Sequence, residues 1–426
     1  MRDLTDLESA GRTRRDRLLM LAPIMPSDRG SGLAMRAGFF LDAYSRRYDV
    51  DLVVAPVAGS MAPTPFVQSR VQRLHILKID GAGSHYRLVT SVRDPAARLE
   101  AFRQFGRPSL AAFTDPVRPL LEAWAESSAY RVLHVFRLYL AELAADWATR
   151  KGDRTRLVLD CDENDALAYR RIAAMERRRG NFLAADWAEA EATAFDAMAA
   201  AWLQKFHLVF AASNQEAKSL ARSGAAIHAI PNLMASPPPH RAPGRPRRPR
   251  KILFVGTLGY APNADAIHWF VARVWPRLDR ALRHRVHLTI VGRNPPASIA
   301  RLRRRGITVA GSVADVGRYY RDADLAIVPL FAGGGTRFKI IEAATFGVPL
   351  VTTSFGIAGT TFQRNVDVVV ADDHERFLRA CLSLLRDTAR SRRLMTNAGM
   401  KTRRDYSPSY WRARIADLAV GESNEG

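Results

Sequence analysis

The sequence has few cysteines, few lysines and no long apolar run, and each shortage excludes a class of protein. Among its 426 residues only Cys161 and Cys381 are cysteines, which is too few for a disulfide framework or a CxxC metal or redox site. We therefore expect a reducing, cytoplasmic location. No apolar run reaches the roughly 18 residues that span a bilayer. The apolar segment 18–25 contains Pro23 and is followed by Pro26, so a buried strand is expected there rather than a signal sequence.

The composition is that of a globular protein with a strong positive charge. Hydrophobic residues make up 47% and charged residues 25%, which excludes disordered and collagen-like chains. At about 150 residues per domain, the length predicts two or three domains. Lys and Arg total 64 against 42 Asp and Glu, so the formal net charge is +22, almost all of it from arginine. Such a charge attracts lipid headgroups, phosphorylated substrates or nucleic acid, but Arg-rich and Ala-rich usage is also typical of a GC-rich genome.

The chain divides near its middle. Residues 236–250 are rich in arginine and in proline, which has no backbone donor, and such a segment with clustered like charges is typical of an exposed linker. We therefore predict a first domain over residues 1–235, a linker over 236–250 and a second domain over 251–405. A helix over 406–426 could lie across either domain.

Short apolar runs alternate with segments of helical spacing in both halves. The second half predicts helices at 264–278 and 338–346 and strands at 251–255, 286–291, 324–328, 348–352 and 366–370. The first half predicts strands at 17–22, 50–54, 71–76, 132–135, 157–159 and 206–211 and a long helix at 181–202 whose aromatic stripe is expected in the core. This pattern predicts an α/β fold of two doubly wound, Rossmann-like domains facing across a cleft. Ligands should then bind where the carboxyl ends of the strands meet helix N-termini.

The most informative segment is GGGTRFKIIEA, residues 333–343, between a predicted strand and a predicted helix. Glycines allow a ligand close to the backbone, and the amides of a helix start favour an anion. Arg337 and Lys339 lie where the helix dipole disfavours cations, so a bound diphosphate would relieve the conflict. Glu342 lies on the same side of the helix as Lys339 and can accept hydrogen bonds from a diol such as ribose.

The order of segments resembles the nucleotide-sugar-binding domain of GT-B glycosyltransferases, in particular glycosyltransferase family 4. The resemblance covers roughly residues 251–400 and rests on FVGTLGYAPN at 254–263, IVG at 290–292 and the stretch from Gly333 to Gly347 followed by PLV at 349–351. It implies that Glu342 holds the ribose and that Arg337 and Lys339 act catalytically on the donor diphosphate. The further donor contacts that we predict in this half are Gly256, Gly334, Gly335 and Thr336.

The chain departs from the family pattern in two places. Gly334 stands where many members have the first glutamate of a two-glutamate motif, and in those members the carboxylate contacts the sugar. The loop after the first strand of this half has Thr257 and Tyr260 in place of an Arg and a Lys. In similar subgroups with a Tyr-x-Pro-Asn sequence, Arg337 and Lys339 are expected to take over the phosphate charge.

The first half resembles the family more weakly. Gly30 and Gly32 follow the first strand and match a glycine-rich loop near the donor phosphates, although an ordinary turn explains them equally well. His134 stands where family members often have a histidine facing the sugar, which makes it a candidate catalytic residue; a core or surface histidine is the alternative. Asp160-Cys161-Asp162-Glu163 contains a DxD pattern, which we interpret as loop structure or an acceptor contact rather than a metal site.

The resemblance implies a retaining glycosyltransferase that moves a sugar from a nucleotide-diphosphate donor to a glycan or lipid-linked acceptor. No metal or other cofactor is expected. Two alternatives remain at this point: a nucleotide-sugar epimerase, for which only His134 and Asp160 lie in comparable places, and a non-catalytic polyanion-binding protein. Nucleic acid is not an expected partner, because the basic residues are scattered and lack interleaved aromatics. Attraction to the anionic inner leaflet of the plasma membrane would account for the charge.

Overall fold

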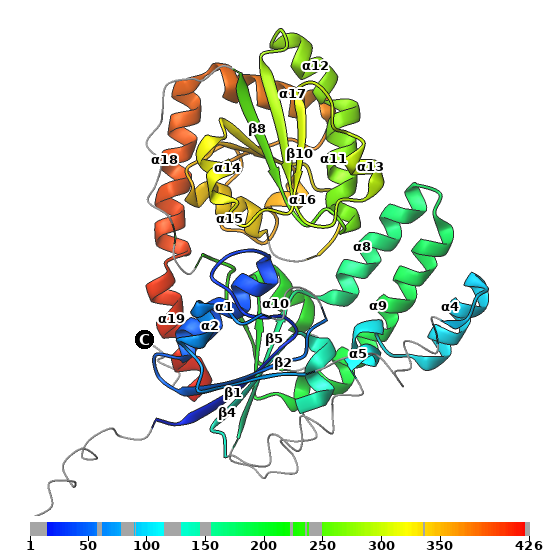
Figure 1. The fold of residues 1–426 in the computed structure, drawn as a ribbon, viewed down its shortest axis with the longest axis vertical. Coiled ribbons are helices and arrows are strands. Elements are labelled where there is room, and N and C mark those ends of the chain that lie inside the picture. Colours follow the sequence, from blue (N-terminus) through cyan, green and yellow to red (C-terminus); the bar gives the residue numbers. More distant parts are fainter. Residues whose placement is uncertain are drawn as a thin grey trace, which may run out of the picture.

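Two parallel sheets form the framework of the protein (Figure 1). The computed structural model describes residues 15–57, 62–77, 89, 91–114, 129–144, 155–221, 225–234, 237, 249–334 and 337–421. In this part of the chain the first sheet has seven strands in the order β3-β2-β1-β4-β5-β6-β7. These strands are β1 (Arg17–Ala22), β2 (Asp49–Val54), β3 (Arg73–Ile76), β4 (Val132–Phe136), β5 (Arg156–Asp162), β6 (Leu208–Ala211) and β7 (Ile227–Ala229).

The second sheet has six strands in the described residues, in the order β10-β9-β8-β11-β12-β13. They are β8 (Arg250–Val255), β9 (Val286–Val291), β10 (Ile307–Gly311), β11 (Leu325–Val328), β12 (Leu350–Thr352) and β13 (Val369–Val370). In both sheets the strand order reverses beside the first strand, between β1 and β4 and between β8 and β11. All the strand pairs are parallel, so the predicted doubly wound α/β class is confirmed.

Helices connect the strands and cover the sheets (Figure 1). The first domain has α1 (Gly32–Tyr44), α2 (Pro65–Gln68), α4 (Pro95–Phe105), α5 (Ser109–Thr114), α8 (Asp165–Arg178), α9 (Phe182–Trp202) and α10 (Asn214–Leu220), with short 3₁₀ turns at Leu138–Leu140 and Leu203–Lys205. The second has α11 (Ala261–Arg273), α12 (Trp275–Ala281), α13 (Ala297–Ala300), α14 (Gly317–Asp322), α15 (Phe338–Thr345), α16 (Ser354–Ile357), α17 (His374–Arg386) and α18 (Thr388–Asp405).

The central strands are buried on both faces, which explains why they appear in the sequence as unbroken apolar runs. Leu18 to Leu21 of β1 are at most 1% exposed. On α9 the predicted core stripe is confirmed for Phe195 and Met198, which are buried, whereas Trp202 is partly exposed and lies over the Lys205 ammonium. The predicted strand at 348–352 begins only at Leu350, after Pro349, which has no backbone donor for the sheet.

The last helix, α19 (Pro408–Val420), returns from the second domain to the first and packs on α1. Figure 1 shows α18 running down beside the second domain and α19 continuing along the first. Two ion pairs fasten α19: Arg47 with Asp417 at 2.6 Å, and Arg412 with Asp42 at 2.5 Å. The chain therefore crosses between the domains twice, once in the segment between β7 and β8 and once between α18 and α19. All but three residues of the predicted linker, 236–250, lie outside the described part of the chain.

Candidate active site between the two domains

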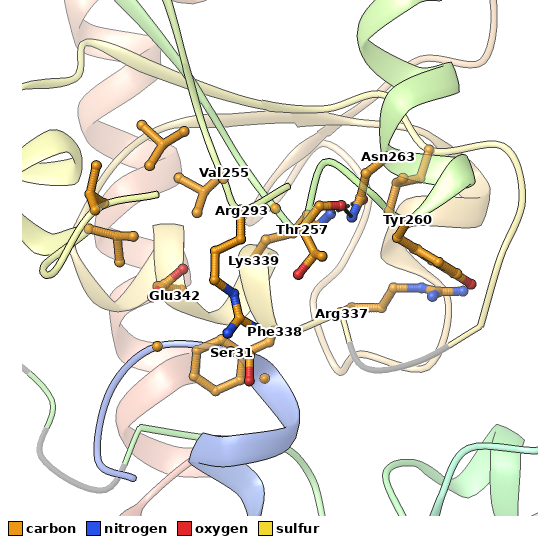
Figure 2. A pocket seen from close by; sticks show the side chains of 18 of the residues that line it. Ser31, Val255, Thr257, Tyr260, Asn263, Arg293, Arg337, Phe338, Lys339 and Glu342 are labelled. Atoms are coloured by element: carbon orange, nitrogen blue, oxygen red, sulfur yellow. Dashed lines mark hydrogen bonds between the residues drawn. The ribbon is translucent and has the colours of Figure 1, made fainter. Parts of the chain in front are cut away.

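A cavity of about 390 Å³ lies at the carboxyl ends of β8, β9 and β11, where the second domain faces the first. Figure 2 shows side chains from its wall. The predicted site residues that line it are Gly30, Gly32, Gly256, Gly334, Arg337, Lys339 and Glu342. The predicted residues Gly335 and Thr336 lie outside the described part of the chain. The structure thus brings loops from both domains to one cavity, and the roles of the residues remain predictions.

Lys339 is held in the first turn of α15. Its ammonium donates a hydrogen bond to Asn263 Oδ1 at 2.5 Å and lies 5.1 Å from the centre of the Phe254 ring. A Cβ on Gly256 would come within 3.1 Å of the Lys339 Nζ, so glycine at 256 leaves room for this amine. Burial, and then repulsion by Arg337, lowers the pKa of Lys339 to about 7. An anion bound beside Lys339 would favour its protonated form.

Glu342 lies one turn further along α15 and is buried. Its carboxylate accepts a hydrogen bond from the Tyr320 hydroxyl. Burial raises the pKa of Glu342 to about 7, and the Tyr320 hydrogen bond and the Lys339 charge oppose the rise. Figure 2 shows Glu342 at one side of the cavity and Lys339 nearer its centre. The acceptor and the cation of the predicted motif therefore face the same space.

Arg337 takes a different direction from the other two motif residues. Its guanidinium lies 4.5 Å above the Phe355 ring and donates to the Gly334 carbonyl at 3.4 Å. In Figure 2 it extends toward Tyr260, on the side of the cavity opposite Glu342. Burial lowers the pKa of Arg337, and the carboxylates of Glu216 and Glu163 oppose this. Both of those carboxylates belong to the first domain, so Arg337 is electrostatically coupled across the cleft.

Arg293 is a cavity residue that the sequence analysis missed. It follows β9 and Gly292, and Figure 2 shows its side chain extending between Glu342 and Lys339. An arginine directly after a strand and a glycine, at the sheet edge where ligands bind, was the available signal. The cations that the loop after β8 lacks are thus partly supplied by the loop after β9.

The Tyr-x-Pro-Asn segment supports the glycine loop and Lys339. The Tyr260 hydroxyl accepts a hydrogen bond from the Gly334 backbone N–H at 2.9 Å, while Asn263 accepts from Lys339. Asn263 also donates to the Thr257 carbonyl at 2.8 Å, which fixes its side chain. Gly333 has a φ of +103°, a conformation that glycine adopts without strain. Tyr260 and Asn263 therefore hold in place the glycine loop and the lysine that the sequence motif predicts.

Comparison with known proteins finds a similarity in the second domain. Residues 249–387 match the family model described as glycosyl transferases group 1. The match covers most of the second domain and none of the first. No curated protein sequence matches the chain.

Solved structures with the same two-domain fold include several GT-B glycosyltransferases. HepE of Anabaena, solved with UDP and glucose, has a TM-score of 0.63 at 14% identity over 96% of this chain and 100% of HepE. Sucrose-phosphate synthase of Thermosynechococcus elongatus has a TM-score of 0.61 at 15% identity over 95% and 98% of the two chains. TarM has a TM-score of 0.63 at 10% identity over 95% and 98%. The predicted GT-B fold is thereby confirmed.

In the first domain, His134 does not reach the cavity. It is fully buried in the first domain, its Nδ1 lies 2.6 Å from the Tyr44 hydroxyl, and its ring stacks on Phe136 at 4.4 Å. The prediction that His134 faces the substrate is wrong in this structure. The physical reason is that β4 continues for two residues after His134, which places the histidine inside the sheet rather than at its end.

The acidic cluster at the end of β5 belongs to a buried ion network. Asp160 accepts two hydrogen bonds from Arg36, at 2.6 and 2.9 Å, and is fully buried. Asp162 pairs with Arg137 at 3.2 Å. Asp160 is therefore bonded within the protein and does not line the cavity, so neither His134 nor Asp160 adds an observation in favour of the epimerase alternative. The described residues contain no group of three His, Cys, Asp or Glu side chains placed to hold a metal ion.

Proposed function

We propose that the protein is a retaining glycosyltransferase that uses a nucleotide-diphosphate sugar. The observation that supports this most strongly is the cavity in which Lys339 and Glu342 face the same space within a group 1 glycosyltransferase domain. Lys339 and the start of α15 bind the diphosphate, and the Glu342 carboxylate accepts hydrogen bonds from the ribose hydroxyls. Retention of the anomeric configuration follows the family 4 resemblance, and we assign no protein nucleophile.

The same residues stabilise the charge that develops during transfer. Cleavage of the anomeric bond leaves negative charge on the departing diphosphate, and Lys339 and Arg293 lie on the cavity wall where they neutralise it. The loop at Gly30–Gly32 approaches from the first domain and limits the access of water to the bond that breaks. With cations from the chain in this role, we expect transfer to need no added metal ion.

HepE, which shares the fold, was solved with UDP and glucose, so uridine diphosphate sugars are the first donors to test. Purified protein should be screened by thermal shift against UDP-sugars and GDP-sugars. The donor that raises the melting temperature should then be assayed for transfer to glycan and lipid-linked acceptors, with and without a metal chelator. Loss of the shift in Lys339→Met and Glu342→Gln supports the assignment. An unchanged shift in both variants contradicts it.

The acceptor in this proposal is a glycan or a lipid-linked glycan of cell-surface polysaccharide synthesis, met at the inner face of the plasma membrane.

None of the helices that the structure describes has the length and apolarity to cross a bilayer. On α18, however, Arg393, Asn397, Met400 and Arg404 share one helical side, and Met400 is 53% exposed. Basic residues beside an exposed apolar side chain favour an anionic interface. Flotation with anionic but not neutral liposomes is expected; equal flotation with both contradicts membrane attraction.

A further inference from the structure

Glu163 reaches the glycosyltransferase domain from the opposite side of the cleft. It lies in the tight turn between β5 and α8, where Asp162 has a φ of +63° and the Glu163 N–H donates to the Cys161 carbonyl at 2.7 Å. The next residue, Asn164, caps α8 by accepting a hydrogen bond from the Leu167 N–H at 3.0 Å. The backbone on both sides of Glu163 is therefore fixed, and a hydrogen bond from Arg137 Nη2 at 3.1 Å holds its carboxylate.

The Glu163 carboxylate occupies the space that a side chain on residue 334 would need. A Cβ built on Gly334 would overlap the Glu163 Oε2 and the Ala168 Cβ and would lie 3.0 Å from the Glu163 Cδ. Gly334 itself lines the cavity. Next to it, Arg171 of α8 donates to the Gly333 carbonyl at 3.4 Å. The start of α8 is thus docked on the glycine loop, and only a glycine at 334 allows this approach.

One oxygen of this carboxylate lacks a hydrogen-bond partner among the residues that the structure describes. Oε1 accepts from Arg137 Nη2 at 3.1 Å, whereas Oε2 is buried and accepts no hydrogen bond. The whole side chain is 15% exposed. Burial raises the pKa of Glu163 to about 7, the Arg137 charge opposes the rise, and the nearby Asp165 adds to it. A buried carboxylate oxygen without a donor is costly, so a donor from a bound ligand would be favourable.

The place of Glu163 relative to the donor rests on the proposed function. If Glu342 holds the ribose and Lys339 the diphosphate, the sugar extends beyond Lys339, away from Glu342. Figure 2 shows Tyr260 and Arg337 on that side, and Gly334 is hydrogen-bonded to Tyr260 there. A sugar presents hydroxyl donors, which are the complement of an acceptor-only carboxylate oxygen.

We propose that Glu163 accepts a hydrogen bond from a hydroxyl of the transferred sugar and so determines which donor sugar is used. The first domain supplies this carboxylate oxygen, which fits only because Gly334 has no side chain. The contact forms only when α8 is docked on the glycine loop, so the donor sugar is recognised by the two domains together.

The test compares binding of a nucleoside diphosphate with binding of its sugar conjugate, using UDP and UDP-glucose and the corresponding GDP and GDP-mannose pair. Affinities are measured by calorimetry for the wild type, Glu163→Gln and Glu163→Asp, which keeps the charge but withdraws it from Gly334. Asp165→Asn is the matched control, because Asp165 also pairs with Arg137 but is not among the nearest neighbours of Gly334. Melting temperatures show whether each variant is folded.

For the nucleotide sugar that the wild type binds best, Glu163→Gln and Glu163→Asp should weaken binding about tenfold or more, while binding of the nucleoside diphosphate changes less than about twofold. Asp165→Asn should leave both affinities within about twofold. The role of Glu163 is overturned, and the proposed function is not, by either of two results. Both Glu163 variants bind the sugar conjugate with wild-type affinity, or they lose as much affinity for the nucleoside diphosphate as for the conjugate. A wild type that binds none of the four nucleotides overturns the proposed function, and the role of Glu163 with it.

Discussion

Replacement of Lys339 by methionine should make the protein more stable and weaken its binding of the donor. The pKa of Lys339 falls from a usual 10.5 to about 7, so folding carries a penalty at every pH below 10.5 that reaches its full size below pH 7. At pH 7 a shift of this size corresponds to about 4 kcal/mol. Because Lys339 keeps some exposure to cavity water, we take about half, or about 2 kcal/mol. Lys339→Met should then melt about 4–8 °C higher at pH 7.

The same replacement should change the pH profile of nucleotide binding. The wild type needs Lys339 protonated and Glu342 ionised, and since both pKa values are about 7, binding of UDP should be strongest near pH 7. Without the lysine only Glu342 titrates, so the residual affinity should rise about tenfold from pH 6 to pH 8. In Glu342→Gln only Lys339 titrates, and affinity should fall about tenfold over the same range. Calorimetry at pH 6, 7 and 8 measures both slopes. Parallel profiles in the two variants, or a melting temperature for Lys339→Met below that of the wild type, would refute this reasoning.

Four further outcomes are expected. Arg293→Gln should reduce turnover about tenfold or more through loss of a charged contact to the departing diphosphate, as measured by release of the nucleotide; unchanged turnover would contradict its placement. Gly334→Ala should lower kcat/KM at least tenfold but leave UDP binding nearly unchanged, since its Cβ separates the domains rather than filling the nucleotide end; a fully active variant would show that the two loops need not meet. His134→Gln should lower the melting temperature but change kcat/KM of the folded protein less than about threefold, because the ring lies in the core; a large loss of kcat/KM would restore it as a catalytic candidate. Arg412→Met should weaken the attachment of α19 by removing the cation that pairs with Asp42, and limited proteolysis near residue 407 should then be faster than in the wild type.

The arrangement of strands could be predicted because of how the sheets are buried. Strands such as β1 and β11 are covered on both faces or nearly so, and they appear as continuous apolar runs between helical segments. The strands that were missed, β7 and β10, are short or partly exposed, so neither forms a continuous apolar run. The prediction for His134 failed because His134 lies inside the strand predicted at 132–135, and every side chain of β4 is buried.

Only part of the site could be predicted, because the rest depends on contacts between the two domains. Lys339 and Glu342 lie in one helix directly after a glycine loop, so their spacing in the sequence fixes their spacing in the cavity. The approach of Glu163 to Gly334 joins the turn after β5 to the loop after β11, and it depends on how the two domains dock. A sequence pattern contains no information on that docking. The glycine at 334, which departs from the family pattern, is explained only when both domains are seen together.

A crystal structure of the protein with the nucleotide sugar that most raises its melting temperature tests the central claim most directly. The account predicts diphosphate oxygens within hydrogen-bond distance of the Lys339 Nζ and ribose hydroxyls within hydrogen-bond distance of the Glu342 carboxylate. Nucleotide density bound elsewhere, with both of these side chains still bonded only to the protein, would contradict it.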